Sequence, residues 1–255
     1  MWNSIKTHLF SIMFSWGKYI EKQRFSKPPI YIGGCGRSGT TLLLSVLSAH
    51  KDIFGIPKEL NLFEEAEIKN DQIFTPRFYR LYRTLIFTKI KKTANRYCEK
   101  SPVNIRHIDL INKKNRGNFR MIHMVRDGRD VILSKHPRKK DGYWIDPERW
   151  INDVKIGIKQ NSDVNILMVK YEDLVTDYER TIRIICDFLE IETSVEILEW
   201  HNYTNVRKNN ALFTEIDRIY DKSINKYTKP ENQSRVKQLT NNPEAIDLLK
   251  QLGYI

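Results

Sequence analysis

The sequence predicts a single α/β domain with a central parallel β-sheet and helices on both faces. Three observations predict it. Apolar runs that resemble buried strands occur at 30–32, 121–125 and 165–171, and each is followed by a turn and a helical segment. A glycine-rich turn joins the first run to its helix. The length of 255 residues suits one domain with a full core.

The first predicted strand, the turn and the helix after it form a phosphate cradle. The run Ile30–Ile32 is apolar, glycines follow, and Thr40 opens a helical segment that we expect to end near His50. Glycines let the backbone approach an anion, and the N–H groups at a helix start point toward it. A glycine-rich turn that binds nothing is the alternative.

The spacing in this loop almost fits the nucleotide-binding pattern G-x-x-x-x-G-K-[ST] of P-loop proteins. Gly34 and Gly39 take the places of the two glycines, but Thr40, followed by Thr41, stands where the lysine should be. Nucleoside triphosphatases use that lysine on their β- and γ-phosphates. We therefore expect a phosphate outside any triphosphate–magnesium centre, with Arg37 as the cation.

This loop resembles the 5′-phosphosulfate loop of sulfotransferases, which use 3′-phosphoadenosine 5′-phosphosulfate (PAPS) as donor. The resemblance implies a catalytic role for Arg37, no metal, and a set of donor-binding residues: Gly36, Arg37, Ser38, Gly39, Thr40 and Thr41.

The composition favours an anionic partner and a reducing compartment. The net charge is +12 and the pI is about 9.5, although a lysine-rich composition without a target gives the same values. We expect no nucleic-acid partner, because no zinc-finger, RNA-binding or basic-zipper signature is present. The cysteines Cys35, Cys98 and Cys186 show neither metal nor disulfide spacing. A cytoplasmic location is expected.

Residues 1–27 are predicted to form an N-terminal amphipathic helix or arm, and residues 28–255 the sulfotransferase domain. Apolar side chains recur at helical spacing between Ile5 and Tyr19, with basic residues around them. The apolar stretch is too short to span a bilayer. A helix packed on the domain is one interpretation, and peripheral contact of residues 1–24 with a membrane surface is the other.

A carboxylate follows at Glu59, about twenty residues past the loop. Many surface loops contain Lys-Glu, so the residue alone is weak evidence for a general base. The segment Lys58–Phe63 is similar to the Lys-Glu-x-His-x-Phe motif of carbohydrate sulfotransferases, with Asn61 in place of the histidine. In that family the glutamate is the catalytic base. Tyrosylprotein sulfotransferases also place a glutamate base in this region.

Residues 64–95 are predicted to be helical and basic, either as a lid over the acceptor or as a packed helix. A short strand ending at Pro102 follows. The segment Cys98–Pro102 is similar to Cys-Asn-Lys-Asp-Pro of tyrosylprotein sulfotransferases. This resemblance implies that Lys100 assists the departing phosphate.

A second phosphate site is predicted where the strand Met121–Val125 ends. Arg126 follows the strand, and a helix is expected to begin across Val131–Ser134. A cation at a strand end and a hydroxyl on a helix suit a phosphate, whereas an arginine–aspartate network holding a turn is the alternative. The stretch closely resembles the 3′-phosphate motif of sulfotransferases. Arg126 and Ser134 match its arginine and serine, and Arg138 matches a further arginine of the tyrosylprotein group.

Two phosphate sites together indicate PAPS more strongly than either alone. ATP carries its phosphates in one chain at the 5′ end, whereas PAPS carries phosphate at both ends of its ribose.

The remaining elements complete the α/β pattern. Helices are expected at 103–112, 146–160, 181–189 and 243–251, and a mobile loop at 137–143. Val169–Val175 is similar to a common sulfotransferase segment whose tyrosine approaches the nucleotide, which makes Tyr171 a candidate. Ser223 and Lys229–Asn232 resemble a late loop that closes over the nucleotide. The family's following lysine is replaced by Gln238.

The resulting hypothesis is transfer of a sulfuryl group from PAPS to an acceptor hydroxyl. A carbohydrate acceptor is favoured slightly, because a basic surface suits an acidic glycan. A tyrosine-like phenol is the alternative. A nucleotide kinase with a degenerate P-loop, and a basic membrane- or nucleotide-binding module, are the other classes considered. The missing lysine argues against the kinase.

Overall fold

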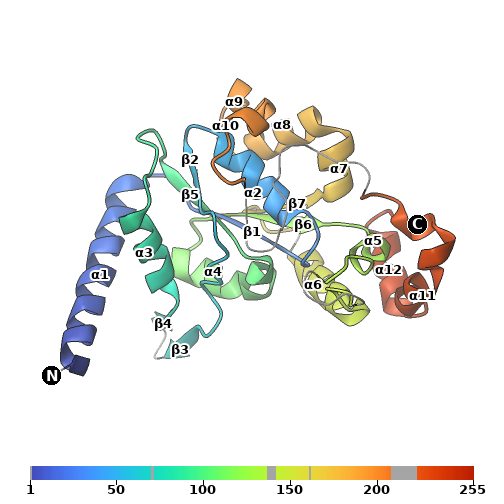
Figure 1. Ribbon diagram of the computed structural model, residues 1–255, viewed down its shortest axis with the longest axis horizontal. Coiled ribbons are helices and arrows are strands. Elements are labelled where there is room, and N and C mark those ends of the chain that lie inside the picture. Colours follow the sequence, from blue (N-terminus) through green and yellow to red (C-terminus); the bar gives the residue numbers. More distant parts are fainter. Residues whose placement is uncertain (1, 70–71, 137–141, 161, 208–222) are drawn as a thin grey trace.

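The computed structural model of the protein describes residues 2–69, 72–136, 142–160, 162–207 and 223–255 (Figure 1). Its centre is a five-stranded sheet in the order β2-β5-β1-β6-β7, and every strand pair is parallel. The strands are β1 (Ile30–Gly34), β2 (Ile53–Gly55), β5 (Arg96–Lys100), β6 (Arg120–Val125) and β7 (Ile166–Lys170). The predicted fold class is confirmed.

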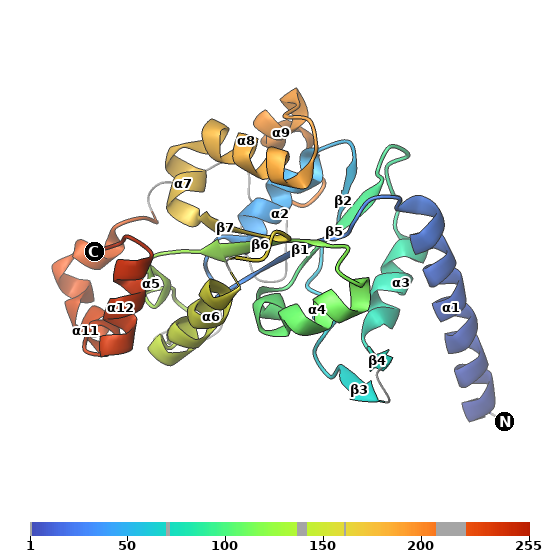
Figure 2. The same cartoon turned by 180° about the vertical axis from the view of Figure 1, so that it is seen from behind.

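Helices cover both faces of this sheet (Figures 1 and 2). One face carries α2 (Thr40–Ala49), α7 (Tyr171–Thr176), α8 (Tyr178–Leu189), α9 (Val195–Leu198) and α10 (Trp200–Tyr203). The other carries the 3₁₀ helix η1 (Pro102–His107), α4 (Ile108–Asn115) and α6 (Pro147–Lys159). Beyond the β7 side lie α5 (Gly128–Val131), η2 (Lys226–Thr228), η3 (Pro230–Asn232), α11 (Gln233–Thr240) and α12 (Pro243–Gln251).

The sheet is buried on both faces because its central strands are apolar on both faces. All five residues of β1 are buried. Ile30 and Ile32 belong to a cluster with the apolar side of α2, whereas Tyr31 between them belongs to a second cluster on the opposite face. This alternation follows from the period of two along a strand.

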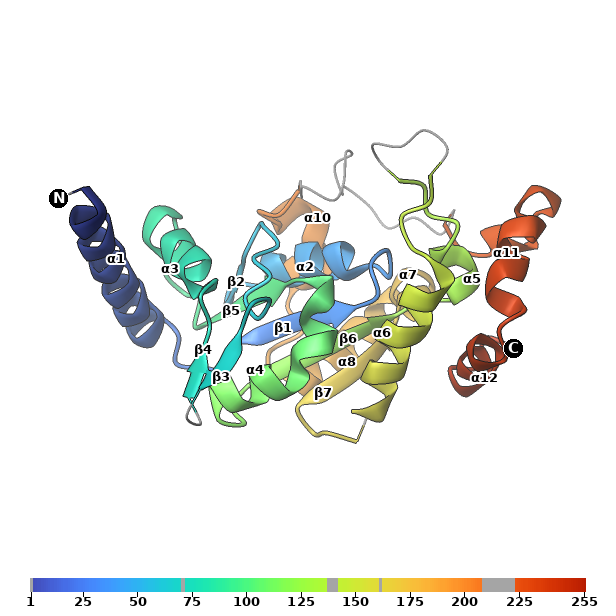
Figure 3. The ribbon, with the colours of Figure 1, turned by 90° about the horizontal axis from the view of Figure 1, so that it is seen from below.

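The predicted N-terminal helix is α1 (Trp2–Arg24), which packs along α3 (Phe78–Phe87) at the β2 side of the molecule (Figure 3). The ring of Phe14 meets the ring of Tyr82 edge-on, with centroids 4.6 Å apart. Gly17 lets the helices approach, because a Cβ there would lie 2.1 Å from Cβ of Tyr82. The described part of the chain contains no helix long and apolar enough to cross a membrane.

The structure corrects the predicted helix over 64–95. Among the described residues of that range only α3 is helical, and it is preceded by the antiparallel pair β3 (Glu67–Lys69) and β4 (Gln72–Phe74). The few apolar residues of the two short strands fit both the helical period and the strand period, so their spacing does not distinguish a helix from a hairpin. The helix expected to begin across Val131–Ser134 is also shifted. It is the four-residue α5, which begins at Gly128, because the Asp127 carboxylate accepts the Arg129 N–H and caps it there.

One polar residue in the core of the sheet stands out. His123 on β6 is fully buried against α6, and neither ring nitrogen has a hydrogen-bond partner among the described residues. Gly157 of α6 makes room for the ring, since a Cβ there would lie 2.0 Å from His123 Cε1. Burial lowers the pKa of His123 from its ordinary 6.5 to about 4.

We expect this histidine to make stability pH-dependent. Between these two pKa values the unfolded chain binds a proton that the folded chain excludes, so stability is full above about pH 6.5 and falls toward pH 4. Lowering the pH from 7 to 5 should lower the free energy of unfolding by about 2 kcal/mol through this residue. Urea unfolding of the wild type and His123→Leu at both pH values would measure it. An equal loss in both proteins would contradict the assignment.

Candidate active site

The parallel sheet brings distant segments to one edge. Ile32 of β1 is paired with Lys100 at the end of β5, Gly34 with Met124 of β6, and Val125 with Lys170 of β7. All these strands therefore end side by side, and the loops that leave them meet. In open α/β sheets ligands bind outside the carboxyl ends of the strands.

The predicted phosphate loop leaves the middle of this edge. Gly39 precedes α2 with φ 88°, and a Cβ there would lie 2.4 Å from the Tyr171 ring. Because glycine has no side chain to cap the helix, the first N–H groups of α2 stay available to an anion. The Ser38 hydroxyl is buried without a hydrogen-bond partner among the described residues. The loop therefore offers unsatisfied donors at a helix start.

The backbone of Arg37 is left-handed, with φ 71°, and its side chain lies near a second guanidinium. Burial lowers the pKa of Arg37, and the charge of Arg126 lowers it further. Two cations held close together and partly removed from water favour a bound anion between or beside them. The predicted 5′ and 3′ cations are thus brought together from segments far apart in sequence.

Arg126 joins three parts of the chain. Its Nη1 donates to the Arg37 carbonyl at 3.1 Å and its Nη2 to the Ser223 carbonyl at 2.5 Å. The guanidinium lies over the Tyr171 ring at 4.4 Å, and the Tyr171 hydroxyl is 2.7 Å from Ser223 Oγ. The structure therefore assembles four predicted residues into one cluster.

Two further predicted residues form a separate pair. Lys100 is fully buried at the end of β5, and its ammonium is paired with the carboxylate of Glu59. Burial lowers the pKa of Lys100, and the Glu59 charge opposes that effect. The predicted base and the predicted leaving-group cation are thus in direct contact.

A group of residues that the sequence did not single out holds this pair in place. The buried carboxylate of Glu99 accepts the Leu60 N–H at 3.1 Å, the Ser101 hydroxyl at 2.6 Å and the Asn104 amide at 2.8 Å. Ser101 Oγ in turn accepts the Asn61 N–H at 2.9 Å. The loop after Glu59 is therefore fixed by its backbone. An acidic residue inside a buried strand was the available signal.

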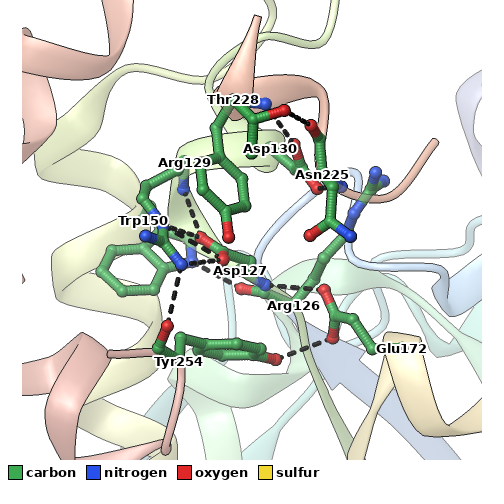
Figure 4. Close-up of polar contacts among 10 residues, drawn as sticks. Arg126, Asp127, Arg129, Asp130, Trp150, Glu172, Asn225, Thr228 and Tyr254 are labelled. Atoms are coloured by element: carbon green, nitrogen blue, oxygen red, sulfur yellow. Dashed lines mark hydrogen bonds and ion pairs between the residues drawn. The ribbon is translucent and has the colours of Figure 1, made fainter.

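Asp130 was also missed. Its buried carboxylate accepts the backbone N–H groups of Asn225 at 2.8 Å and Tyr227 at 3.0 Å, which holds η2 over the end of β6 (Figure 4). Burial raises the pKa of Asp130, and the charge of Arg126 opposes that effect. The late segment is therefore attached to the second phosphate motif, next to Ser223.

Four other predicted residues lie in the phosphate loop, at the start of α2 or after α5. Gly36 is close to α6 and the segment before it, where a Cβ would lie 3.5 Å from Arg149 Nη2. Thr40 is buried and Thr41 half-buried at the start of α2. Ser134 is half-buried after α5, with its N–H donated to the Val131 carbonyl. Arg138 lies outside the described residues. Within the described ranges no group of three or more His, Cys, Asp or Glu side chains could hold a metal.

The parallel sheet and the loop at its edge define an α/β protein that binds phosphate groups at the start of a helix. A family model then identifies the family. The model of the sulfotransferase domain matches residues 27–241. The chain belongs to the sulfotransferase family, whose donor is PAPS. At the level of the family, this match confirms the prediction of a PAPS-dependent sulfotransferase. The uncapped helix start, the orphaned Ser38 hydroxyl and the two cations fit such a donor.

Curated relatives include protein-tyrosine sulfotransferases. The chain is 27% identical over 230 residues to the protein-tyrosine sulfotransferase of Drosophila melanogaster, which covers 77% of this chain and 44% of the relative. It is 27% identical over 271 residues to protein-tyrosine sulfotransferase A of Caenorhabditis elegans, covering 90% of this chain and 68% of the relative. The chain thus spans less than half of the length of the fly protein.

Solved structures share the fold at low identity. The sulfotransferase domain of the olefin synthase of Synechococcus PCC 7002 has a TM-score of 0.57 at 19% identity, covering 91% of this chain and 96% of that one. Mouse sulfotransferase SULT7A1, which was solved with PAP, has a TM-score of 0.54 at 14% identity, covering 94% and 95%. These likenesses establish the fold.

The loop geometry leads to a test with a matched control. Gly39→Ala adds a methyl group against the Tyr171 ring, and we expect at least a roughly tenfold loss of affinity for adenosine 3′,5′-bisphosphate. Gly117→Ala imposes a similar left-handed strain, with φ 78°, but its nearest contact is Asn112 Oδ1 at 3.8 Å. It should lower stability and leave affinity unchanged. If Gly39→Ala and Gly117→Ala both bound the bisphosphate as tightly as the wild type, the loop would not hold the nucleotide.

Proposed function

We propose that the protein transfers the sulfuryl group of PAPS to the phenolic hydroxyl of a tyrosine. The main support for a tyrosine acceptor is that the relatives of the chain include protein-tyrosine sulfotransferases. The resemblance of Cys98–Pro102 to that group points the same way. The slight preference for a carbohydrate acceptor is therefore replaced by its alternative. The experiment below also tests an acidic glycan as the acceptor.

The residue roles follow from the charges that the reaction develops. Arg126 and Ser134 are assigned to the 3′-phosphate. The first N–H groups of α2, with Thr40 and Thr41, are assigned to the 5′-phosphate. Catalysis of such a transfer depends mainly on positioning and on stabilising charge.

Glu59 is the proposed general base. A tyrosine hydroxyl has an ordinary pKa near 10, so a carboxylate that accepts its proton as the oxygen bonds to sulfur lowers the barrier. The bond between sulfur and the 5′-phosphate oxygen breaks in the same step. Lys100 and Arg37 neutralise the negative charge that grows on that oxygen.

The contact between Glu59 and Lys100 supports this division of roles. Lys100 is fully buried, and its one described ion pair is with Glu59. A phosphate oxygen that approaches Lys100 competes with the carboxylate for the same ammonium. Donor binding then makes the Glu59 oxygen more available to a proton. The pair would keep the buried ammonium neutralised until the donor arrives.

The experiment measures transfer of labelled sulfate from PAPS to a tyrosine-containing peptide, to the same peptide with phenylalanine, and to an acidic glycan. We expect labelling of the tyrosine peptide alone. Glu59→Gln should lower kcat by about 10²–10⁴-fold and keep affinity for adenosine 3′,5′-bisphosphate. Labelling of the glycan alone would contradict the tyrosine acceptor. Normal turnover in Glu59→Gln would show that Glu59 is not the general base.

Calorimetry without magnesium separates the classes of enzyme. Tight binding of adenosine 3′,5′-bisphosphate, with weak binding of ATP and AMP, is expected from two separate phosphate sites. Preference for ATP would favour the kinase and contradict the sulfotransferase proposal.

We also propose that α1 contacts an anionic membrane surface. Its outer face exposes Ile12, Trp16 and Tyr19 at helical spacing, with Lys18 and Lys22 exposed beside them. Trp and Tyr favour the membrane interface, and lysines attract anionic lipids. This would place the protein at the surface of a membrane, and the expected cytoplasmic location stays a prediction.

Flotation with vesicles tests this contact. Wild-type protein should float with vesicles that contain anionic phosphatidylserine and not with neutral phosphatidylcholine vesicles. The double variant Trp16→Ser/Tyr19→Ser should lose most of the binding. Phe87→Ser removes an even more exposed aromatic from α3 and should keep the binding. Equal loss in both proteins, or no flotation of the wild type, would rule out α1 as a lipid contact.

A further inference from the structure

The segment after α12 meets the end of β6 through Tyr254 (Figure 4). The Tyr254 hydroxyl donates to Glu172 Oε2 at 2.8 Å, and the other oxygen of that carboxylate accepts the Asp127 N–H at 3.0 Å. The Tyr254 carbonyl accepts Arg129 Nη2 at 2.9 Å, and Arg129 also donates to both oxygens of the Asp127 side chain. Tyr254 therefore reaches Asp127 by two routes, one to its backbone and one to its side chain.

Asp127 directly follows Arg126, so its placement sets the direction in which that guanidinium leaves the strand. The Arg126 carbonyl is fixed from the other side, where it accepts Trp150 Nε1 at 3.1 Å. Gly128 packs against the same indole, since a Cβ there would lie 2.5 Å from Trp150 Cε2. The turn 126–129 is thus held between α6 and the pair Glu172–Tyr254.

The local backbone brings Tyr254 to this position. Gly253 is left-handed, with φ 69°, and its N–H donates to the Lys250 carbonyl at 2.8 Å. The Tyr254 N–H donates to the Leu249 carbonyl at 2.8 Å, so the chain turns back at the end of α12. The ring then lies 5.0 Å from the Lys170 ammonium.

Glu172 is sensitive to the loss of this hydroxyl. Its carboxylate is largely removed from water, and burial raises its pKa, while the bonds from Asp127 and Tyr254 oppose that effect. A buried carboxylate that loses a donor is destabilised and rotates toward other donors. The Asp127 N–H would then lose its acceptor.

We propose that Tyr254 is a positioning residue for the 3′-phosphate site, acting on Arg126 through Glu172, Arg129 and Asp127. The inference rests on the proposed function, because the partner of Arg126 there is the 3′-phosphate of PAPS. It assigns to the last turn of the described chain a part in donor recognition.

The test compares adenosine 3′,5′-bisphosphate with AMP, which lacks the 3′-phosphate, by calorimetry on the full chain. Tyr254→Phe removes only the hydroxyl. We expect it to weaken binding of the bisphosphate roughly threefold to tenfold and to leave binding of AMP within about twofold. The ratio of the two dissociation constants isolates the 3′-phosphate, and a general loss of stability would not change it.

A matched control is available in α8. The Tyr178 hydroxyl donates to the Ile197 carbonyl at 2.6 Å where α8 meets α9, and neither residue belongs to the network around Tyr254. Tyr178→Phe removes one comparable hydrogen bond and should leave the ratio unchanged. Glu172→Gln tests the route, because the amide keeps one accepting oxygen for two donors. If Tyr254 acts through Glu172, the double variant should bind the bisphosphate no more weakly than the weaker single variant.

The outcomes are separable. A wild type that prefers the bisphosphate, with the same ratio in Tyr254→Phe, would overturn the inference and leave the proposed function intact. Effects of Tyr254→Phe and Glu172→Gln that multiply independently would overturn the route through Glu172. A wild type that shows no preference for the bisphosphate would contradict the proposed function, and the inference with it.

Discussion

The guanidinium of Arg126 is the interaction on which the rest of the site depends. It is a permanent charge with only 7% exposure, and its described partners are two backbone carbonyls and the face of Tyr171. Carbonyls and a ring solvate the cation without a direct ion pair, and the nearby carboxylates of Asp130 and Glu172 accept backbone N–H groups instead. The buried Arg126 Nε has no hydrogen-bond partner among the described residues, so it can donate to a ligand. The two carbonyl contacts fix the phosphate loop at Arg37 and the late segment at Ser223. The proposed binding group for the 3′-phosphate thus also joins the two loops.

Three carboxylates, two buried and one half-buried, complete this arrangement. Glu99, Asp130 and Glu172 each accept backbone N–H groups from a segment that borders the site. An ionised carboxylate is an acceptor with two oxygens, so it can hold two donors at once where an amide would present one donor of its own. Their burial raises their pKa values, and the donors that surround them oppose this. The loops that border the site are therefore attached through main-chain atoms, which tolerate sequence change better than side-chain contacts.

The fold and the two phosphate motifs were predictable because they are local. Thr40 directly follows the glycine loop and Arg126 directly follows an apolar strand, so each motif can be recognised within a short stretch of sequence. Other contacts join positions far apart in the sequence, so no local pattern predicts them. They are the ion pair of Glu59 with Lys100, the hydrogen bonds from η2 and the residue before it to Asp130, and the hydrogen bond from Tyr254 to Glu172. The hairpin at 67–74 was missed because so short a segment carries no decisive period. The slight preference for a carbohydrate acceptor rested on net charge, which describes the surface and not the site, whereas the curated relatives favour the tyrosine alternative.

The strand order has a consequence for how the chain folds. The central strand β1 is flanked by β5 and β6, whose residues Cys98 and Arg120 both pair with Ile30. The first strand of the sheet must therefore wait for partners that are synthesised much later, and helical crossovers have to close before any pairing is gained. Such long-range contacts make folding slow. Until β5 and β6 arrive, β1 has unpaired strand edges and the apolar side of α2 is uncovered. The segment that is proposed to cradle the donor is therefore also where association of newly made chains would begin.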